Sequence, residues 1–170
     1  MARVYLSIGS NVQREQHVTV ALDALAAAFS PLSISSVYDS EAVGFNGRSF
    51  LNLVVGLDTD WSVAALSDWL KALENRHGRR RDVPRFSPRT LDVDILAVDD
   101  QVGTPAGVEL PRGEILTNAF VLRPLAEIAP QQRHPVDGRN YGELWQAYDR
   151  PQQLEPIVFH WQGRQISPRS

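Results

Sequence analysis

Two aspartates separated by a single residue form the pattern with the clearest chemical meaning in this sequence. Asp92 and Asp94 lie in the run LDVDIL, where apolar and acidic residues alternate as they do in a strand. Alternate side chains of a strand share a face, so we expect the two carboxylates to lie together while Leu91, Val93 and Ile95 point into the core. Mg²⁺ prefers carboxylate oxygens together with water and phosphate, and it would relieve the repulsion of such a pair. A pair of surface aspartates is the alternative, because so short a motif recurs by chance.

A strongly cationic segment directly precedes the aspartates and favours the metal-binding interpretation. It contains Arg79, Arg80, Arg81, Arg85 and Arg89. Guanidinium groups bind phosphate oxygens in pairs, and together with Mg²⁺ they stabilise the charge that spreads during phosphoryl transfer. The alternative for the segment alone is a solvated or RNA-binding basic run. The sequence has neither a P-loop pattern nor a kinase-type glycine-rich loop, so an enzyme that uses ATP would need a different architecture.

The composition excludes several other kinds of site. The 170 residues include no cysteine, which rules out disulfides, thiolate metal ligands and cysteine nucleophiles. The four histidines are scattered without metal-ligand spacing. A formal net charge of -3 argues against a general nucleic-acid binder. Because the chain shows neither a secretory signal nor a long apolar segment, we expect a cytoplasmic monomer with no membrane or nucleic-acid partner.

The hydrophobic periodicity predicts the elements that position these residues. Alternation predicts strands over residues 3–8, 33–38, 50–57 and 91–98, and helical spacing predicts helices over about 13–29 and 63–73. The order β-α-β-β-α-β is that of a ferredoxin-like α/β fold, in which two helices cover one face of a small sheet. In the later part of the sequence we expect a loop over 103–113, helices over 119–128 and 141–148, and an edge strand after Pro151 in the segment IVFHWQGRQI at 157–166. We expect a single domain over residues 1–170.

Four motifs with consistent spacing give the chain a resemblance to a known family. They are YLSIGSN at 5–11, FLN at 50–52, PRTLDVDIL at 88–96 and AFVLRPLAEIAP at 119–130. Over about residues 4–130 the chain resembles the 6-hydroxymethyl-7,8-dihydropterin pyrophosphokinases of folate synthesis. The resemblance implies a ferredoxin-like core with added elements. It also implies transfer of the β,γ-pyrophosphoryl group of ATP to the pterin hydroxymethyl oxygen, with release of AMP.

The resemblance also implies a set of site residues. Two Mg²⁺ ions are expected on the aspartate pair, with two arginines steadying the transferred group, so that the catalytic residues are Arg79, Arg89, Asp92 and Asp94. The residues expected to bind ATP as co-substrate are Lys71, Glu74, Arg81, Arg85, Ile95 and Arg112. Two aromatic rings and an amide are expected to hold the pterin, with loop contacts, giving Ser40, Ala42, Val43, Phe50, Asn52 and Phe120.

Without the resemblance, two of these assignments have simpler interpretations. The phenylalanines Phe50 and Phe120 would be ordinary core residues, since most aromatic side chains are simply buried. Glu74 would be a solvent-facing charge on its helix.

The chain departs from the family pattern at the phosphate-binding end. Arg112 follows Pro111 where the family has histidine, and Asn118 replaces an arginine. Lys71 stands in place of a glutamine, and Glu109 in place of a small hydroxyl residue. Arg112 and Lys71 preserve positive charge with a different geometry.

Three alternatives to the standard reaction remain, the first two because of these departures. The first is a divergent copy that acts on another pterin, and the second is a pterin-binding protein with weak or no activity. The third is a ferredoxin-like module that binds nucleic acid, for which FLNLVVGL lacks the glycine-and-aromatic signature.

Overall fold

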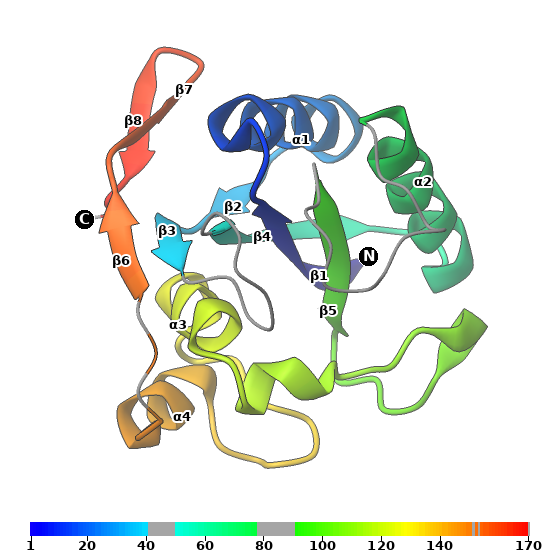
Figure 1. The fold of residues 1–170 in the computed structure, drawn as a ribbon. Helices are drawn as coiled ribbons and strands as arrows, with labels where there is room; N and C mark the ends of the chain where they lie inside the picture. The colour runs from blue at the N-terminus through cyan, green and yellow to red at the C-terminus, as the bar shows by residue number, and fades with distance from the viewer. Residues whose placement is uncertain (41–49, 78–90, 151, 153, 170) are drawn as a thin grey trace.

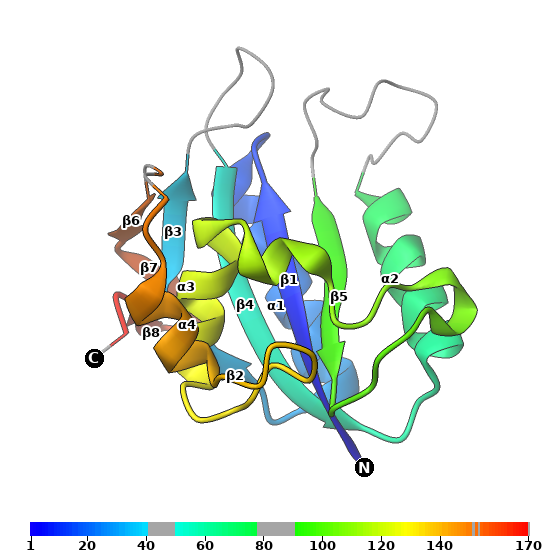
Figure 2. The same ribbon diagram turned by 90° about the horizontal axis from the view of Figure 1, so that it is seen from below.

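The fold is built on one antiparallel sheet with helices on both faces (Figures 1 and 2). The computed structural model describes residues 1–40, 50–77, 91–150, 152 and 154–169. Within these residues the six-stranded sheet has the order β5-β1-β4-β3-β6, and β2 also pairs with β4. Its strands are β1 (Ala2–Ser10), β2 (Ser33–Ile34), β3 (Val37–Ser40), β4 (Phe50–Thr59), β5 (Asp92–Val98) and β6 (Leu154–Ile157).

Two helix layers enclose this sheet. Helices α1 (Arg14–Phe29) and α2 (Val63–Arg76) cover one face, while α3 (Ala119–Ile128) and α4 (Tyr141–Ala147) lie on the other (Figure 1). The strand order and the helices between the strands confirm the predicted ferredoxin-like α/β core, with α3, α4 and the C-terminal strands added to it.

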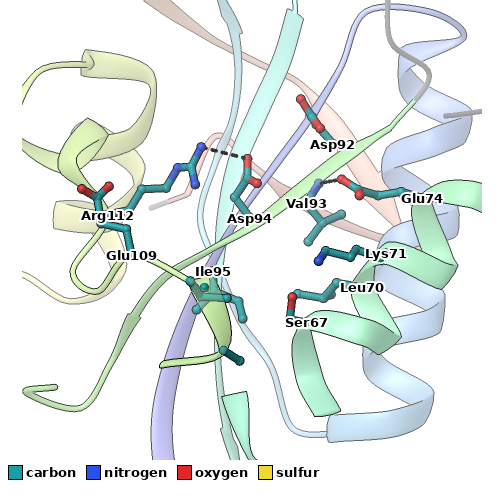
Figure 3. A pocket seen from close by; sticks show the side chains of 13 residues that line it. Ser67, Leu70, Lys71, Glu74, Asp92, Val93, Asp94, Ile95, Glu109 and Arg112 are labelled. Carbon is teal, nitrogen blue, oxygen red and sulfur yellow. Dashed lines mark hydrogen bonds and ion pairs between the residues drawn. The ribbon is translucent and has the colours of Figure 1, made fainter. Parts of the chain in front are cut away.

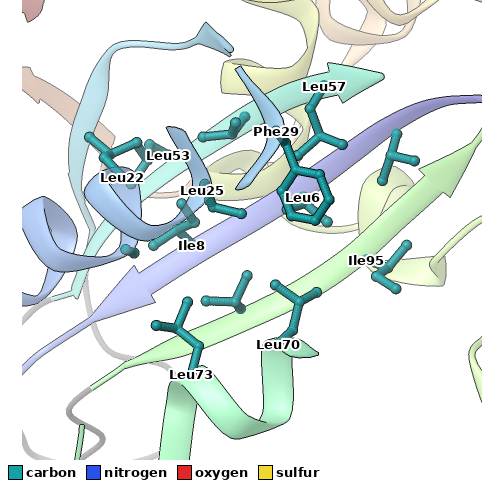
Figure 4. Packing of buried hydrophobic residues seen from close by; sticks show 14 of the residues in the cluster. Leu6, Ile8, Leu22, Leu25, Phe29, Leu53, Leu57, Leu70, Leu73 and Ile95 are labelled. Carbon is teal, nitrogen blue, oxygen red and sulfur yellow. The ribbon is translucent and has the colours of Figure 1, made fainter. Parts of the chain in front are cut away.

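The main core lies between the sheet and helices α1 and α2 (Figure 4). Leu6 and Ile8 project from β1 toward Leu22 and Leu25 of α1, and all four side chains are fully buried. Leu73 of α2 closes the same core beside β5. Burying each such aliphatic side chain contributes about 1.5–3 kcal/mol, so this layer fixes both helices against the strands.

A second, smaller core lies between the opposite face of the sheet and helices α3 and α4. Val54 of β4 packs there with Leu122 and Leu125 of α3 and with Tyr141 of α4. Asn140 begins α4 with a capping box, since its side chain accepts a bond of 2.7 Å from the N–H of Glu143. These contacts fix α3 and α4 against this face of the sheet.

Three local features differ from the sequence prediction. The segment 33–38 forms two short strands, β2 and β3, instead of one. The predicted loop 103–113 contains a 3₁₀ turn, η1 (Pro105–Gly107), and a second turn, η2 (Gly113–Leu116), follows it. The sheet gains an edge strand after Pro151 as expected, but this strand is β6, and most of the predicted segment 157–166 instead forms a separate hairpin of β7 (Phe159–Trp161) and β8 (Arg164–Ser167).

Within the described ranges, none of the helices has both the length and the apolar character that a membrane crossing requires. The prediction of a single domain stays a prediction.

Candidate active site

Strand β5 presents the two aspartates as the sequence predicted. Along the strand Asp92 and Asp94 are partly exposed, whereas Val93 and Ile95 are buried against the main core. Asp92 is the cross-strand partner of Gly9, and Asp94 is the partner of Ser7, so both aspartates share one face of the sheet. Among the described strands β5 is an edge strand of the sheet, and α2 packs beside it.

A cavity of about 290 Å³ opens beside these aspartates (Figure 3). Helix α2 forms one wall, β5 forms the floor, and the segment from η1 to Arg112 forms the opposite wall. Six of the residues predicted from the sequence line it, namely Lys71, Glu74, Asp92, Asp94, Ile95 and Arg112. The structure therefore brings together the described part of the predicted metal and ATP sets.

Glu74 has a different environment from the solvent-facing one that its position on a helix suggested. Its side chain is only 4% exposed, and Oε2 accepts a hydrogen bond of 2.8 Å from the backbone N–H of Val93. The outward N–H groups of an edge strand lack a strand partner, so a carboxylate from α2 fills that role here. The bond ties α2 to β5 at the residue between the two aspartates.

Arg112 stands on the opposite side of the cavity, where it contacts two carboxylates. Its Nε donates to Glu114 Oε1 at 2.7 Å, and its Nη2 lies 3.9 Å from Asp94 Oδ2 (Figure 3). Burial acts to lower the pKa of Arg112, but the nearby charges of Asp94, Glu114 and Glu109 outweigh it and raise that pKa above its ordinary value. The guanidinium is therefore a permanent cation facing the aspartate pair.

Three of the four residues that depart from the family pattern, Arg112, Asn118 and Glu109, are held by hydrogen bonds within the segment 109–118. Asn118 donates from Nδ2 to Glu114 Oε2 at 3.0 Å, and Gly113 donates its N–H to Glu109 Oε1 at 3.0 Å. The backbone N–H of Arg112 donates to the carbonyl of Leu96 at 2.8 Å. Arg112 is thus held to β5 through its backbone while its side chain is oriented by Glu114.

The residues predicted to bind the pterin lie on the neighbouring strands. Ser40 pairs with Phe50 across β3 and β4, and Ser40 Oγ donates a hydrogen bond to Asn52 Oδ1. Asn52 is also the cross-strand partner of Gly9, whose other partner is Asp92. The amide and the first aspartate therefore flank one glycine on the same face of the sheet.

Gly9 lies in the motif YLSIGSN, and the sequence predicts no role for it. A Cβ atom at this position would lie 2.9 Å from Asn52 Nδ2 and 3.6 Å from Phe50 Cδ1. Contacts below 3.0 Å are not sustained by real side chains, so only glycine leaves space for the Asn52 amide in its present position. Its place between two predicted site residues is visible only once the strands are paired.

Phe120 comes to this side of the sheet from the first turn of α3. Its ring is partly buried and packs at the margin of the smaller core. Phe50, at the beginning of β4, is also partly buried. The two rings belong to different elements that face the same side of the sheet, and no direct contact between them is found in the described part of the chain.

Strand β3 is held in place by Glu127 of α3, a second residue without a predicted role. Its carboxylate accepts bonds from the N–H of Ser36 at 2.6 Å and from the hydroxyl of Tyr38 at 3.2 Å. Burial, with Glu127 beside it, raises the pKa of Tyr38 to about 12, so this phenol remains a donor. Tyr38 pairs with Asn52 in the register, so the contact fixes the strand that carries Ser40.

The remaining predicted site residues lie outside the residues that the structure describes. They are Ala42 and Val43 of the predicted pterin set, Arg81 and Arg85 of the ATP set, and the catalytic Arg79 and Arg89.

The donor set suits Mg²⁺ held jointly by protein and substrate. Among residues 1–40, 50–77, 91–150 and the described tail, no group of three or more His, Cys, Asp or Glu side chains could hold a metal by itself. Asp92 and Asp94 instead provide two carboxylates beside a cavity. Mg²⁺ is commonly bound by one or two carboxylates, with water and substrate phosphates completing its six oxygens. The residues present fit that ion.

The antiparallel ferredoxin-like sheet and the paired carboxylates beside a polar cavity define an α/β protein with the features of a metal-assisted phosphate-transfer site. Comparison with known proteins identifies the family. Residues 5–130 match the model of the 7,8-dihydro-6-hydroxymethylpterin-pyrophosphokinase family, and the chain belongs to that family.

Two relatives illustrate the similarity in sequence. A 2-amino-4-hydroxy-6-hydroxymethyldihydropteridine pyrophosphokinase of Pseudomonas aeruginosa is 38% identical over 146 residues, which cover 84% of this chain and 89% of the relative. The enzyme of the same name from Aquifex aeolicus is 35% identical over 138 residues, covering 80% and 86%.

Solved structures agree in fold. The Plasmodium falciparum HPPK-DHPS crystal structure with pterin and p-hydroxybenzoate superimposes with a TM-score of 0.69 at 12% identity, over 96% of this chain and 48% of that one. The wild-type HPPK-DHPS structure with SDX-DHP gives a TM-score of 0.67 at 12% identity, over 87% and 44%. This chain thus spans less than half of those longer chains, and the similarity concerns the fold.

Proposed function

We propose that this protein transfers pyrophosphate from ATP to 6-hydroxymethyl-7,8-dihydropterin and releases AMP, as a step of folate biosynthesis. The pterin hydroxymethyl oxygen bonds to the β-phosphorus of ATP, and the bond from that phosphorus to the α,β-bridging oxygen breaks. The observation that carries the proposal is the arrangement around Gly9. Its two cross-strand partners are Asn52, expected to bind the pterin, and Asp92, expected to bind the metal.

ATP phosphates are proposed to enter the cavity between α2 and Arg112. Lys71 and Arg112 provide cations on opposite walls, and the aspartates lie on the floor between them. A triphosphate carries too much negative charge to bind beside two carboxylates unless cations separate them. Arg112 and Lys71 are therefore expected to bind phosphate oxygens, while Asp92 and Asp94 bind the metal that accompanies the nucleotide.

Two Mg²⁺ ions are proposed at Asp92 and Asp94. When bound, they would neutralise phosphate oxygens and favour the deprotonated hydroxymethyl oxygen of the substrate. The contribution of the chain is to hold both carboxylates on one rigid strand, fixed by the Glu74 bond to Val93. Such fixed charges stabilise a transition state without having to reorganise during the reaction.

The pterin is proposed to lie over Gly9, against the Asn52 amide and between Phe50 and Phe120. Because Ser40 donates to Asn52 Oδ1, the amide nitrogen is directed toward the space above Gly9. An N–H donor there suits an acceptor on the edge of the pterin ring. Offset stacking on an aromatic ring contributes about 0.5–1.5 kcal/mol beyond the area buried, so two rings give a flat bicycle a favourable site.

This function is tested by measuring AMP formation from ATP by chromatography, in the presence and in the absence of the pterin. We expect AMP only when ATP, Mg²⁺ and 6-hydroxymethyl-7,8-dihydropterin are all present. AMP release that ignores the pterin would contradict the proposal. A protein that binds the pterin without forming AMP would favour a divergent copy that acts on another pterin, or a pterin-binding protein without activity. The altered segment from Arg112 to Asn118 is the reason to consider these two alternatives. A monomeric state and a cytoplasmic location stay predictions.

A further inference from the structure

The contact between Arg112 and Asp94 places two demands on one carboxylate. Arg112 Nη2 lies 3.9 Å from Asp94 Oδ2, on the wall of the same cavity that both residues line. A divalent cation that binds Asp94 and a guanidinium at this distance repel each other. The side chains of Arg112 and Asp94 are partly shielded from solvent, with exposures of 30% and 38%. Solvent therefore screens this repulsion less than it would at an open surface.

Glu114 gives Arg112 a second anchor that does not depend on Asp94. Its Oε1 accepts from the Nε of Arg112 at 2.7 Å, and its Oε2 is fixed by Asn118 Nδ2 at 3.0 Å. The guanidinium can therefore give up Asp94 and remain tethered at the cavity. Because Nε is committed to Glu114, its Nη groups are the donors left to turn toward phosphate oxygens.

The other described charges that line the cavity are placed differently from Arg112. Lys71 stands on the α2 wall, opposite Arg112. Glu74 is committed to the N–H of Val93, and Glu109 to the N–H of Gly113. Arg112 Nη2 lies 3.9 Å from Asp94 Oδ2.

We propose that Arg112 is a positioning residue that couples cation binding to nucleotide binding. Without nucleotide, its guanidinium competes with a free cation for Asp94. When a polyphosphate is bound, the guanidinium contacts the phosphate oxygens instead. Arg112 lowers the affinity of the site for a divalent cation alone. It raises the affinity for a cation that arrives with a polyphosphate, because the phosphate oxygens take over the guanidinium. The site thus selects a metal–polyphosphate complex over the free ion. This inference rests on the proposed function, since it takes Asp94 as a metal ligand.

Two binding measurements on the full chain test the coupling. Mn²⁺, as a spectroscopic substitute for Mg²⁺, is titrated without nucleotide and followed by electron paramagnetic resonance. An ATP analogue with a methylene group between the α- and β-phosphates is titrated with Mg²⁺ in a calorimeter. For Arg112→Gln we expect about threefold to tenfold tighter Mn²⁺ binding and about tenfold weaker analogue binding, because one unit charge is removed near a metal and near a phosphate.

The opposite signs of the two changes separate coupling from structural damage. Arg139→Gln is the matched control, because Arg139 is an exposed arginine whose Nε donates to Asp137 at the same distance of 2.7 Å. This control should change neither affinity. Arg112→Lys, which preserves the charge, should leave Mn²⁺ binding near the wild-type value.

Two outcomes would overturn the inference in distinguishable ways. If Asp94→Asn weakens Mn²⁺ binding while Arg112→Gln leaves it unchanged or weakens it, the coupling role is wrong and the metal site stands. If Asp94→Asn leaves Mn²⁺ binding unchanged, the metal assignment itself is wrong, and the coupling role is wrong with it.

Discussion

The carboxylate of Glu74 accepts a hydrogen bond of 2.8 Å from the backbone N–H of Val93, the residue that separates Asp92 from Asp94. Helix α2 thereby fixes the part of the edge strand on which both aspartates stand. The same bond gives the buried carboxylate of Glu74 a hydrogen-bond partner in the wall of the cavity.

Removing this acceptor should destabilise the protein at the site. Glu74→Ala leaves the N–H of Val93 without its partner, and we expect the free energy of unfolding to fall by about 1–3 kcal/mol. Glu74→Gln keeps an acceptor oxygen and should lose less. Urea unfolding followed by circular dichroism measures both changes. Asp68→Ala, an exposed acidic residue of the same helix, is the control, and a Glu74→Ala variant as stable as that control would contradict the role of the bond.

Gly9 should be specifically required for pterin binding. In Gly9→Ala the added methyl group must displace the Asn52 amide, from which a Cβ would be only 2.9 Å away. We expect the KM for the pterin to rise by about tenfold, the loss of roughly one hydrogen bond to a substrate, with the KM for ATP little changed. Steady-state kinetics with each substrate varied in turn measure the two values.

A second glycine provides a matched control for this substitution. A Cβ at Gly56 would also lie 2.9 Å from a side-chain nitrogen, in this case Arg3 Nη2, on the same pair of strands away from the site. Gly56→Ala should affect stability without changing the KM for the pterin. If both variants alter that KM equally, the effect is a general distortion of the sheet.

His134 should make the protein less stable in mild acid. Its ring is 3% exposed, and Nδ1 accepts bonds from the N–H groups of Val136 and Asp137 at 3.2 and 3.0 Å. Burial lowers the pKa of His134, and this effect outweighs the negative charge of Asp137, which raises that pKa. The unfolded chain therefore binds a proton more readily than the folded one. The contribution of neutral His134 to the free energy of unfolding is therefore complete above the ordinary histidine pKa of about 6.5. It is lost as the pH falls through the lowered pKa of His134 in the folded protein.

His134→Asn isolates this contribution, because the asparagine oxygen can accept the same two backbone bonds without titrating. We expect the urea midpoint of the wild-type protein to fall more than that of the variant between pH 7.5 and 5.5. Equal losses in the two proteins would assign the acid sensitivity to other groups, such as His77, whose pKa is also lowered, by burial and by the charges of His17 and Arg76.

Much of the fold follows from local periodicity in the sequence. Apart from the break between β2 and β3, the order of strands and helices through Val98 was predictable because these elements bury a regular face against the main core. The shared face of Asp92 and Asp94 was predictable for the same reason, since it depends only on alternation within one strand.

Features that depend on distant partners were not predictable. The break between β2 and β3 occurs where the Ser35 hydroxyl accepts from the N–H of Val54 and the N–H of Ser36 donates to Glu127. Those partners lie 19 and 91 residues away. The burial of Glu74 likewise depends on β5 being an edge strand, and the position of Gly9 between Asn52 and Asp92 depends on two strand pairings.

The C-terminal hairpin shows a local signal that was present but easily missed. Gln162 and Gly163 both have positive φ angles, 52° and 74°, and form the two-residue turn between β7 and β8. Such turns favour glycine, so Gly163 marked the turn. The short flanking strands carry too little alternation to separate a hairpin from a continuous edge strand.

The central claim is that Asp92 and Asp94 hold the metal on which pyrophosphate transfer depends. The most direct measurement is pterin-dependent AMP formation by Asp92→Asn and Asp94→Asn, with circular dichroism to verify the fold. Asp100→Asn, an exposed aspartate in the turn after β5, controls for the change in charge. We predict that both site variants fold normally and lose AMP formation by at least about a hundredfold, as expected when a metal ligand is removed, while the control retains it. Wild-type turnover in a folded Asp92→Asn or Asp94→Asn protein would contradict the account.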